Sequence, residues 1–299
     1  MTTFDAIAVI DKPLGITSHD VVAKLRKSLN TKKIGHAGTL DPQASGVLVL
    51  GINRGTRFMQ YFVADSKKYE SIIRLGVATD SDDHDGTITF TKDNQLTRSE
   101  IEAALSAFRG PIMQKPSSVS AIKVNGRRAH DLVRAGEVVD LPARPVTVHE
   151  LIMLDLEHKN IDGLQVTDIT VHVHCSSGTY VRAIARDLGT ALGVGGSVFT
   201  LRRTQAGGFD LSDASDLEDV AQMKFHKLGD IAVRILPTHE ISDGFVKDIA
   251  HGRAIHIQAP EGDKLALLDT AGRLVAIGKQ DAGVFQPDNV FLTRDDLSA

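Results

Sequence analysis

The apolar and polar positions in the first two thirds of the chain predict strands and helices that interleave without a regular order. IAVIDKP (residues 7–13) is an apolar run ending in a Lys-Pro turn, as in a short buried strand. Residues 18–30 have helical spacing, a basic outer face and Ser18 as a candidate N-cap. Residues 47–50, after a glycine-rich loop, and residues 67–78 predict two further strands. The helical apolar positions are Val22, Leu25 and Leu29.

The middle of the chain adds helices and long β-rich stretches. A capping-box pattern, Thr-x-x-Glu, opens a predicted helix in residues 97–110. Residues 146–159 and 164–175 contain period-2 segments, and residues 176–193 predict a helix that one of its two first serines could cap. Because these segments suggest antiparallel pairing rather than a regular βαβ array, we expect an α+β fold with a mixed sheet.

The pattern changes in the last quarter of the chain. Residues 210–229 form an acidic stretch that we interpret as a partly helical connector. Beyond Pro237, short strands separated by turn residues predict a compact all-β module of about 60–70 residues. We therefore expect two domains, residues 1–230 and residues 231–299. The predicted strand segments of the module are GRAIHI, KLALLD, RLVAIGK and VFQPDNVFL.

Composition indicates an ordinary globular protein, with 42% hydrophobic and 24% charged residues among 299. The single cysteine, Cys175, excludes an internal disulfide, and no signal pattern or membrane-spanning apolar run occurs, so we expect a soluble cytoplasmic protein. The net charge is −4, but residues 1–60 carry +4 and residues 109–134 carry +5. Such local basic patches can hold a phosphate backbone, although a charge run is more often only a solvated face.

Three familiar constellations fail on inspection. The acidic stretch in residues 80–86 resembles a calcium loop, but the position that needs a bidentate glutamate is Lys92. His172 and His174 alternate with Cys175 across a predicted strand, and no second ligand pair follows, so a zinc site is not supported. The chain also lacks a G-x-x-x-x-G-K-[ST] phosphate loop.

Several ordered motifs remain, and together they resemble one family. GHAGTLDPQASGVLVLG (residues 35–51) places Asp41 in a turn of glycine, proline and small residues, which alone is an ordinary turn signal. This motif, with the four others given at the end of this paragraph, is similar to the TruB family of tRNA pseudouridine synthases over about residues 5–219. The C-terminal module resembles a PUA-type RNA-binding domain, although Arg253 stands where related modules often have glutamine. The other motifs are DKPLGITSHDVV, KKYESIIRLGVATDSDDHDG, CSSGTYVRAIARDLG and LRRTQAGGF.

The resemblance implies a catalytic domain built on a mixed, bent sheet with a cleft for RNA. It also implies the isomerisation of uridine 55 in the T-loop of tRNA to pseudouridine. The base would leave the stack, detach from the ribose at N1 and rejoin through C5. This reaction needs no redox change and no group donor, so we expect no cofactor and no metal. We further expect a monomer whose partner is the T-arm stem-loop of tRNA.

The resemblance also assigns roles to individual residues. Asp41 is the catalytic carboxylate, acting either on the sugar as a nucleophile or as a base that removes a ribose proton. Arg182 is its expected partner, and Tyr69 would stack on the flipped uracil and help remove the C5 proton. His36 would occupy the space that the base leaves, and Lys12 would support the Asp41 loop or contact a phosphate. The residues expected to wall the pocket are Tyr180 and Leu201.

Other readings stay open at this point. An RNA chaperone that has lost isomerase activity would keep the basic patches and the C-terminal module. The catalytic subunit of a guide-RNA pseudouridylation particle belongs to a related family, and the lack of a basic terminal extension disfavours it. A glycoside hydrolase would need a second carboxylate at a defined distance, for which no motif is present.

Overall fold

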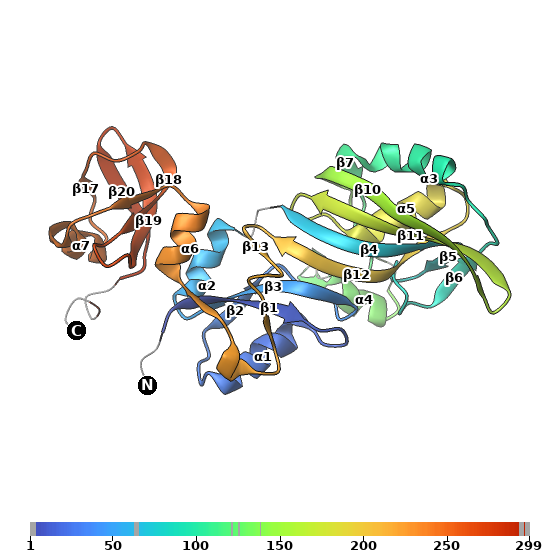
Figure 1. Ribbon diagram of the computed structural model, residues 1–299, viewed down its shortest axis with the longest axis horizontal. Helices are drawn as coiled ribbons and strands as arrows, with labels where there is room; N and C mark the ends of the chain where they lie inside the picture. Colours follow the sequence, from blue (N-terminus) through green and yellow to red (C-terminus); the bar gives the residue numbers. More distant parts are fainter. Residues whose placement is uncertain are drawn as a thin grey trace.

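The computed structural model describes residues 4–62, 66–120, 122–124, 126–137, 139–292 and 296. Within these residues a large mixed sheet forms one part of the molecule and a five-stranded sheet forms the other, with α6 (Leu228–Ile235) between them (Figure 1). Both the α+β class and the small C-terminal β domain are as predicted. No helix of the described residues is long and apolar enough to cross a membrane.

The large sheet is mixed, because β1 runs parallel to β14 and β12 parallel to β3, whereas its other pairs are antiparallel. Register shifts interrupt β10 and β12, and such bulges bend a strand, which fits the curved strands in Figure 1. The order along the sheet is β14 (Ser215–Asp216), β1 (Ala6–Lys12), β3 (Ala44–Ile52), β12 (Gly196–Ala206), β4 (Lys67–Leu75), β11 (Leu164–Cys175), β10 (Arg144–Ile161) and β7 (Gly110–Gln114). Three short strands pair beside this path, namely β2 (Ile34–Ala37), β13 (Phe209–Asp210) and β15 (Phe225–Lys227).

Helices cover the two halves of this sheet separately. The apolar side of α1 (Ser18–Ser28) packs into a core with β1 and β3, whereas α3 (Arg98–Leu105) and α5 (Val181–Ala191) share a core with β4, β10 and β11 (Figure 1). The remaining elements of this part are α2 (Gly55–Phe58), α4 (Ala129–Arg134) and the hairpins β5 (Val77–Thr79) with β6 (Ile88–Thr91) and β8 (Lys123–Val124) with β9 (Arg127–Arg128). Single 3₁₀ turns occur at η1 (Met59–Tyr61), η2 (Ser106–Phe108) and η3 (Val220–Gln222).

The first turns of the helices show which local signals were decisive. The predicted capping box at Thr97 is confirmed. The N-cap of α1 is Thr17 rather than Ser18, because Thr17 and Asp20 form a capping box of their own. The Ser18 hydroxyl is buried instead and bonds both the carbonyl and the amide of Leu40 at 2.9 Å. Ser18 thereby ties α1 to the loop that carries Asp41.

The start of α5 also differs from the prediction. Its N-cap is Tyr180, which makes no side-chain cap bond, so neither serine of the preceding loop caps the helix. The Ser176 hydroxyl accepts a hydrogen bond from the Thr147 amide at 2.9 Å instead. The side chain of Gln114 forms hydrogen bonds with the main chain of Tyr180, donating to its carbonyl at 3.0 Å and accepting from its amide at 2.8 Å. The helix start is thus fixed by β7 and not by its own cap.

The acidic connector, predicted to be partly helical, is helical at the single turn η3 and at its last two residues, where α6 begins. Outside these helical residues the connector supplies β14 and β15, which pair with the edge of β1 that β3 leaves open, β15 near the start of β1 and β14 near its end. Short polar strands at a sheet edge carry little hydrophobic periodicity, so sequence pattern did not reveal them. The connector therefore completes the large sheet before the chain leaves it.

The small sheet packs against the large part through α6. Leu228, Ile231 and Ala232 of this helix share one core with Ile7 of β1 and Leu274 of β19. A domain division at residues 230 and 231 would cut α6 and remains a proposal. One helix of the small part, α7 (Asp243–Ala250), was not predicted. The small sheet has the order β16 (Thr238–Glu240), β18 (Gly262–Leu268), β19 (Leu274–Asp281), β20 (Val284–Val290) and β17 (Ile255–His256).

Candidate active site

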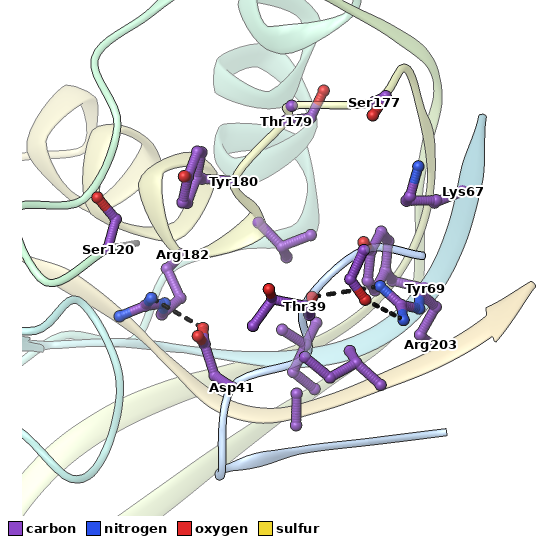
Figure 2. Close-up of a pocket in the computed structure, with 16 residues that line it drawn as sticks. Thr39, Asp41, Lys67, Tyr69, Ser120, Ser177, Thr179, Tyr180, Arg182 and Arg203 are labelled. Atoms are coloured by element: carbon purple, nitrogen blue, oxygen red, sulfur yellow. Dashed lines mark hydrogen bonds and ion pairs between the residues drawn. The ribbon is translucent and has the colours of Figure 1, made fainter. Parts of the chain in front are cut away.

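A pocket of about 260 Å³ opens where the loop before β3 meets β4, β12 and the start of α5. Five of the predicted site residues line it, and they come from four separate segments of the chain (Figure 2). The sheet order places β12 between β3 and β4. The loop before β3 therefore lies close to both β12 and β4. The five are Asp41, Tyr69, Tyr180, Arg182 and Leu201.

Asp41 lies in the turn that leads into β3, and its carboxylate meets Arg182. Oδ2 of Asp41 is 2.8 Å from Nη2 of Arg182, and this ion pair joins two segments that line the pocket (Figure 2). The Asp41 side chain keeps 41% of its surface exposed, whereas that of Arg182 keeps only 6%. The carboxylate can therefore reach a bound molecule, while the buried guanidinium fixes its orientation.

Arg182 is itself held by three further acceptors. Its Nη1 donates to the Ser81 carbonyl at 2.8 Å and to Oδ2 of Asp83 at 3.1 Å, and its Nη2 donates to the Val119 carbonyl at 2.9 Å. Two carboxylates thus face one buried guanidinium, which offsets the cost of burying its charge. Arg182 consequently joins the Asp41 loop to the acidic turn after β5.

The acidic turn of residues 80–86 serves to anchor arginines. Asp82 accepts a hydrogen bond from the Ser117 hydroxyl at 2.6 Å and one from Nη1 of Arg186 at 3.1 Å. Burial raises the pKa of Asp82, and these two partners oppose that rise. Among the described residues no cluster of histidine, cysteine and acidic side chains could hold a metal ion.

Tyr69 projects into the pocket from β4 and is 8% exposed. Burial raises the pKa of its phenol, and the Arg203 guanidinium opposes this rise through its charge and a hydrogen bond. Tyr180 stands at the start of α5, and burial also raises the pKa of its phenol. Leu201 pairs with Ala44 between β12 and β3 and supplies an apolar part of the wall.

The structure does not place Lys12 or His36 in the pocket wall. Lys12 is fully buried, and its Nζ donates to the carbonyls of Pro13 and Ile16 at 2.8 Å and of Pro42 at 3.5 Å. Burial lowers the pKa of Lys12 to about 8. An ammonium buried in this way supports the loop after Asp41 and is not exposed to a phosphate.

His36 lies on β2, ahead of the loop, and its ring meets that of His19 edge-on at 5.4 Å. Burial and the neighbouring His19 lower the pKa of His36. Its Nδ1 is buried and lacks a hydrogen-bond partner among the residues that the structure describes.

Two residues that complete the site were not singled out from the sequence. Asp83 shares the Arg182 guanidinium with Asp41, and its only sequence signal was the acidic stretch in residues 80–86, which had been considered only as a calcium loop and rejected. Arg203 lines the pocket beside Tyr69, within the LRRTQAGGF motif, of which only Leu201 had been given a role. Both depend on strand register and burial, which a single sequence does not display.

The fold occurs in a known RNA-bound assembly. The structure resembles a chain from the structure of an H/ACA RNP bound to a substrate RNA containing 2′-deoxyuridine, with a TM-score of 0.71 and 25% sequence identity. The alignment covers 97% of this chain and 86% of that chain. The likeness extends over both sheets and so includes the strands that converge on the pocket.

The sequence comparisons define the class as pseudouridylate synthase. Residues 26–181 match the N-terminal domain of the TruB family pseudouridylate synthases, and residues 182–240 match the tRNA pseudouridylate synthase B C-terminal domain. The chain belongs to the TruB family, as its motifs had indicated.

Two curated relatives agree with this assignment. The tRNA pseudouridine synthase B of Corynebacterium efficiens is 47% identical over 283 residues, covering 90% of this chain and 94% of the relative. The protein of the same name from Paenarthrobacter aurescens is 48% identical over 251 residues, covering 83% and 80% respectively. The similarity therefore reaches well beyond the five sequence motifs.

Proposed function

We propose that this enzyme converts uridine 55 in the T-loop of tRNA to pseudouridine, with Asp41 as the catalytic carboxylate. The observation that carries the proposal is the 2.8 Å pair between the half-exposed Asp41 carboxylate and the buried Arg182, inside a pocket that Tyr69 also lines. The relatives named tRNA pseudouridine synthase B support tRNA as the substrate.

The proposed reaction would use the groups that line the pocket. The target base must leave its stack, at a cost on the order of a few kcal/mol, before its glycosidic bond can reach a carboxylate. Asp41 then acts on the ribose, as a nucleophile at the sugar or as the base that removes a ribose proton. The uracil detaches at N1, turns and rejoins through C5, so that no atom is gained or lost.

The other residues have supporting roles in this scheme. Arg182 orients the Asp41 carboxylate, and Tyr69 stacks on the uracil and takes up the C5 proton. Tyr180 and Leu201 wall the pocket and keep water from the detached sugar. Lys12 supports the Asp41 loop by donating a hydrogen bond to the Pro42 carbonyl. His36 lies ahead of that loop, where it would enter the space left by the flipped base after the RNA has bound.

RNA contacts beyond the pocket follow from charge and from the second sheet. Residues 1–60 and 109–134 carry a local excess of positive charge, which suits a phosphate backbone. The small C-terminal β domain would act as a PUA-like RNA-binding module beside them. The proposed reaction involves no redox change and no group donor, so we propose that the enzyme works without a metal or cofactor, and we propose that it acts as a monomer.

The test is direct. An unmodified tRNA transcript with tritium at C5 of its uridines is incubated with the protein, and tritium release and the position of pseudouridine are measured. We expect release from position 55 without any guide RNA. Asp41→Asn should abolish turnover while tRNA affinity stays within several-fold, and Asp162→Asn in the exposed β10–β11 turn is the matched control. Refolding of tRNA without tritium release would instead indicate a chaperone.

A further inference from the structure

A second buried arginine, Arg203, stands beside Tyr69 in the pocket. Figure 2 shows it next to the tyrosine, whereas Arg182 lies next to Asp41. Arg203 on β12 is the direct cross-strand partner of Tyr69 on β4 and of Gly46 on β3. Side chains of cross-strand partners project to the same face of a sheet, so the guanidinium and the phenol are neighbours by register.

The guanidinium of Arg203 is bound to main-chain carbonyls. Nε donates to Val47 at 2.7 Å, Nη2 to Gly38 at 3.0 Å and Nη1 to Thr39 at 3.4 Å. A guanidinium has five N–H groups, so these bonds use three of them and leave two. The side chain therefore holds both the loop before Asp41 and the first part of β3, and it retains donors for the pocket.

The charge of Arg203 has no counter-ion in the part of the chain that the structure describes. Arg203 is 1% exposed, and none of the ion pairs among the described residues includes it. A buried charge without a partner is costly, and such groups persist where function needs them. The neighbouring Arg202, on the opposite face of β12, is paired conventionally with Asp11 at 2.6 Å.

Tyr69 is the group on which negative charge can develop next to Arg203. The charged or titratable groups that act on its phenol are Arg203 from β12, Cys175 from β11 and Asp41 from the loop. Of these only Arg203 is a cation. Asp41 and an ionised Cys175 would both disfavour a phenolate.

We propose that Arg203 is a positioning residue for Tyr69, which aims the phenol oxygen into the pocket and stabilises it as a phenolate. This inference rests on the proposed function, because it concerns the final proton transfer of that reaction. There, C5 has become bonded to C1′ of the ribose and must lose its proton.

The proton transfer balances as follows. The phenolate oxygen of Tyr69 takes the proton from C5, and the C5–H electron pair re-forms the C5–C6 double bond. The electrons of the N1–C6 double bond move to N1, which takes a proton from water. The phenol afterwards returns its proton to the solvent. Arg203 gains and loses no proton in this step, and its charge stabilises the phenolate form.

A purely structural role for Arg203 is the competing explanation, since its carbonyl bonds would hold the Asp41 loop in any case. A spectroscopic readout separates the two. The chain has three tyrosines, Tyr61, Tyr69 and Tyr180, so tyrosine labelled with ¹³C at Cζ gives three signals, and Tyr69→Phe identifies one of them. In Arg203→Gln we expect the ionisation of Tyr69 to move to higher pH by about one to three units, the usual effect of removing a nearby opposite charge. Arg203→Lys, which keeps the charge, should move it far less.

The kinetic test is single-turnover conversion of tRNA at saturating enzyme as a function of pH. Arg203→Gln should lose about ten- to a thousandfold in rate, the loss that a shift of one to three units implies, and both proteins should speed up in parallel from pH 7.5 to 9.5, because burial keeps the phenol mostly protonated throughout. In a Tyr69→Phe background the same change should cost less than about threefold, because the two residues act as a unit. Arg202→Gln is the matched control and should stay within threefold of the wild type.

Each outcome decides the matter. An unshifted Tyr69 signal, a rate of Arg203→Gln within threefold of the wild type, or a full further loss in the Tyr69→Phe background would overturn the proposal and leave Arg203 a loop support. If Arg203→Gln fails to fold by circular dichroism, Arg203→Lys carries the test, with the wild-type pH dependence expected at a lower rate. A wild-type protein that forms no pseudouridine would refute the proposed function, whereas the NMR result on Arg203 and Tyr69 could still be read.

Discussion

Arg182→Met is the substitution that most directly tests the carboxylate–guanidinium pair. Methionine keeps much of the length and apolar volume of the arginine stem but removes the charge and every hydrogen bond. Asp41 would lose its 2.8 Å partner, and Asp83 would lose the one at 3.1 Å. The carbonyls of Ser81 and Val119 would lose their donors as well.

The size of the effect follows from burial on the two sides of the pair. Breaking a buried ion pair costs about 3–5 kcal/mol, and the 41% exposure of the Asp41 side chain lets water replace part of the interaction. We therefore take the lower limit, about 3 kcal/mol, for the loss of transition-state stabilisation. Since about 1.4 kcal/mol corresponds to a tenfold rate, single turnover should slow by about a hundredfold or more. Asp83 keeps its hydrogen bond from the Ser81 hydroxyl, which limits the loss of folding stability to about 1–3 kcal/mol.

The assay is tritium release from C5-labelled tRNA in a single turnover, at saturating enzyme and well below the unfolding temperature of the variant. Arg98→Met, the same change on the surface of α3, is the control and should retain the wild-type rate. A rate for Arg182→Met within tenfold of wild type, in a folded protein, would refute the reasoning. The carboxylate would then act without its arginine, and the 2.8 Å contact would be structural only.

Three further predictions concern stability and binding. Because the pKa of Lys12 is lowered to about 8 in the folded protein, the unfolded chain holds more protons between pH 8 and its own value of 10.5. The free energy of unfolding of wild type relative to Lys12→Met, from urea titrations, should therefore rise by up to roughly 3 kcal/mol across that window; a flat difference would contradict the burial of the ammonium. Gly46→Ala should unfold at markedly lower temperature in a calorimetric scan, since φ is +104° and a Cβ would lie 2.1 Å from the Arg203 carbonyl oxygen; Gly283→Ala, also at positive φ but facing open space, is the control. Affinity for tRNA should fall steeply as salt rises from 50 to 200 mM, because basic contacts release counterions, and a salt-independent affinity would argue against the basic segments as the RNA surface.

Hydrophobic periodicity and capping were sufficient for much of the fold. The capping box at Thr97 and the short strands of the C-terminal module appear where the pattern places them, whereas the strand predicted for residues 67–78 is divided at Gly76 into β4 and β5, which belong to different sheets. The predictions that were wrong concern polar groups with more than one available partner. Ser18 has the composition of an N-cap, yet Thr17 caps the helix because Asp20 completes the box from there.

Residues of the candidate site could be predicted from the sequence where each lies within a local motif of its own. Asp41 stands in a distinctive turn, and Tyr69 and Arg182 each lie within a recognisable sequence motif. Asp83 could not be found in this way, because an acidic turn is solvated in most proteins and only the approach of Arg182 from α5 shows otherwise. Contacts between residues about 100 positions apart depend on sheet register, which local sequence does not encode.

The turn around Asp41 shows how these long-range contacts make a local motif functional. An Asp-Pro turn flanked by glycines has little stability of its own, yet three cations from distant segments hold it. Lys12 binds the Pro42 carbonyl, Arg203 binds the carbonyls of Gly38 and Thr39, and Arg182 binds the Asp41 carboxylate. Lys12 and Arg203 bind this turn through main-chain oxygens and not through the Asp41 carboxylate, so the loop stays in place whether or not Asp41 is engaged with RNA. The carboxylate can therefore exchange its arginine contact for the substrate while its backbone remains fixed, which is the condition that a reaction at the ribose imposes.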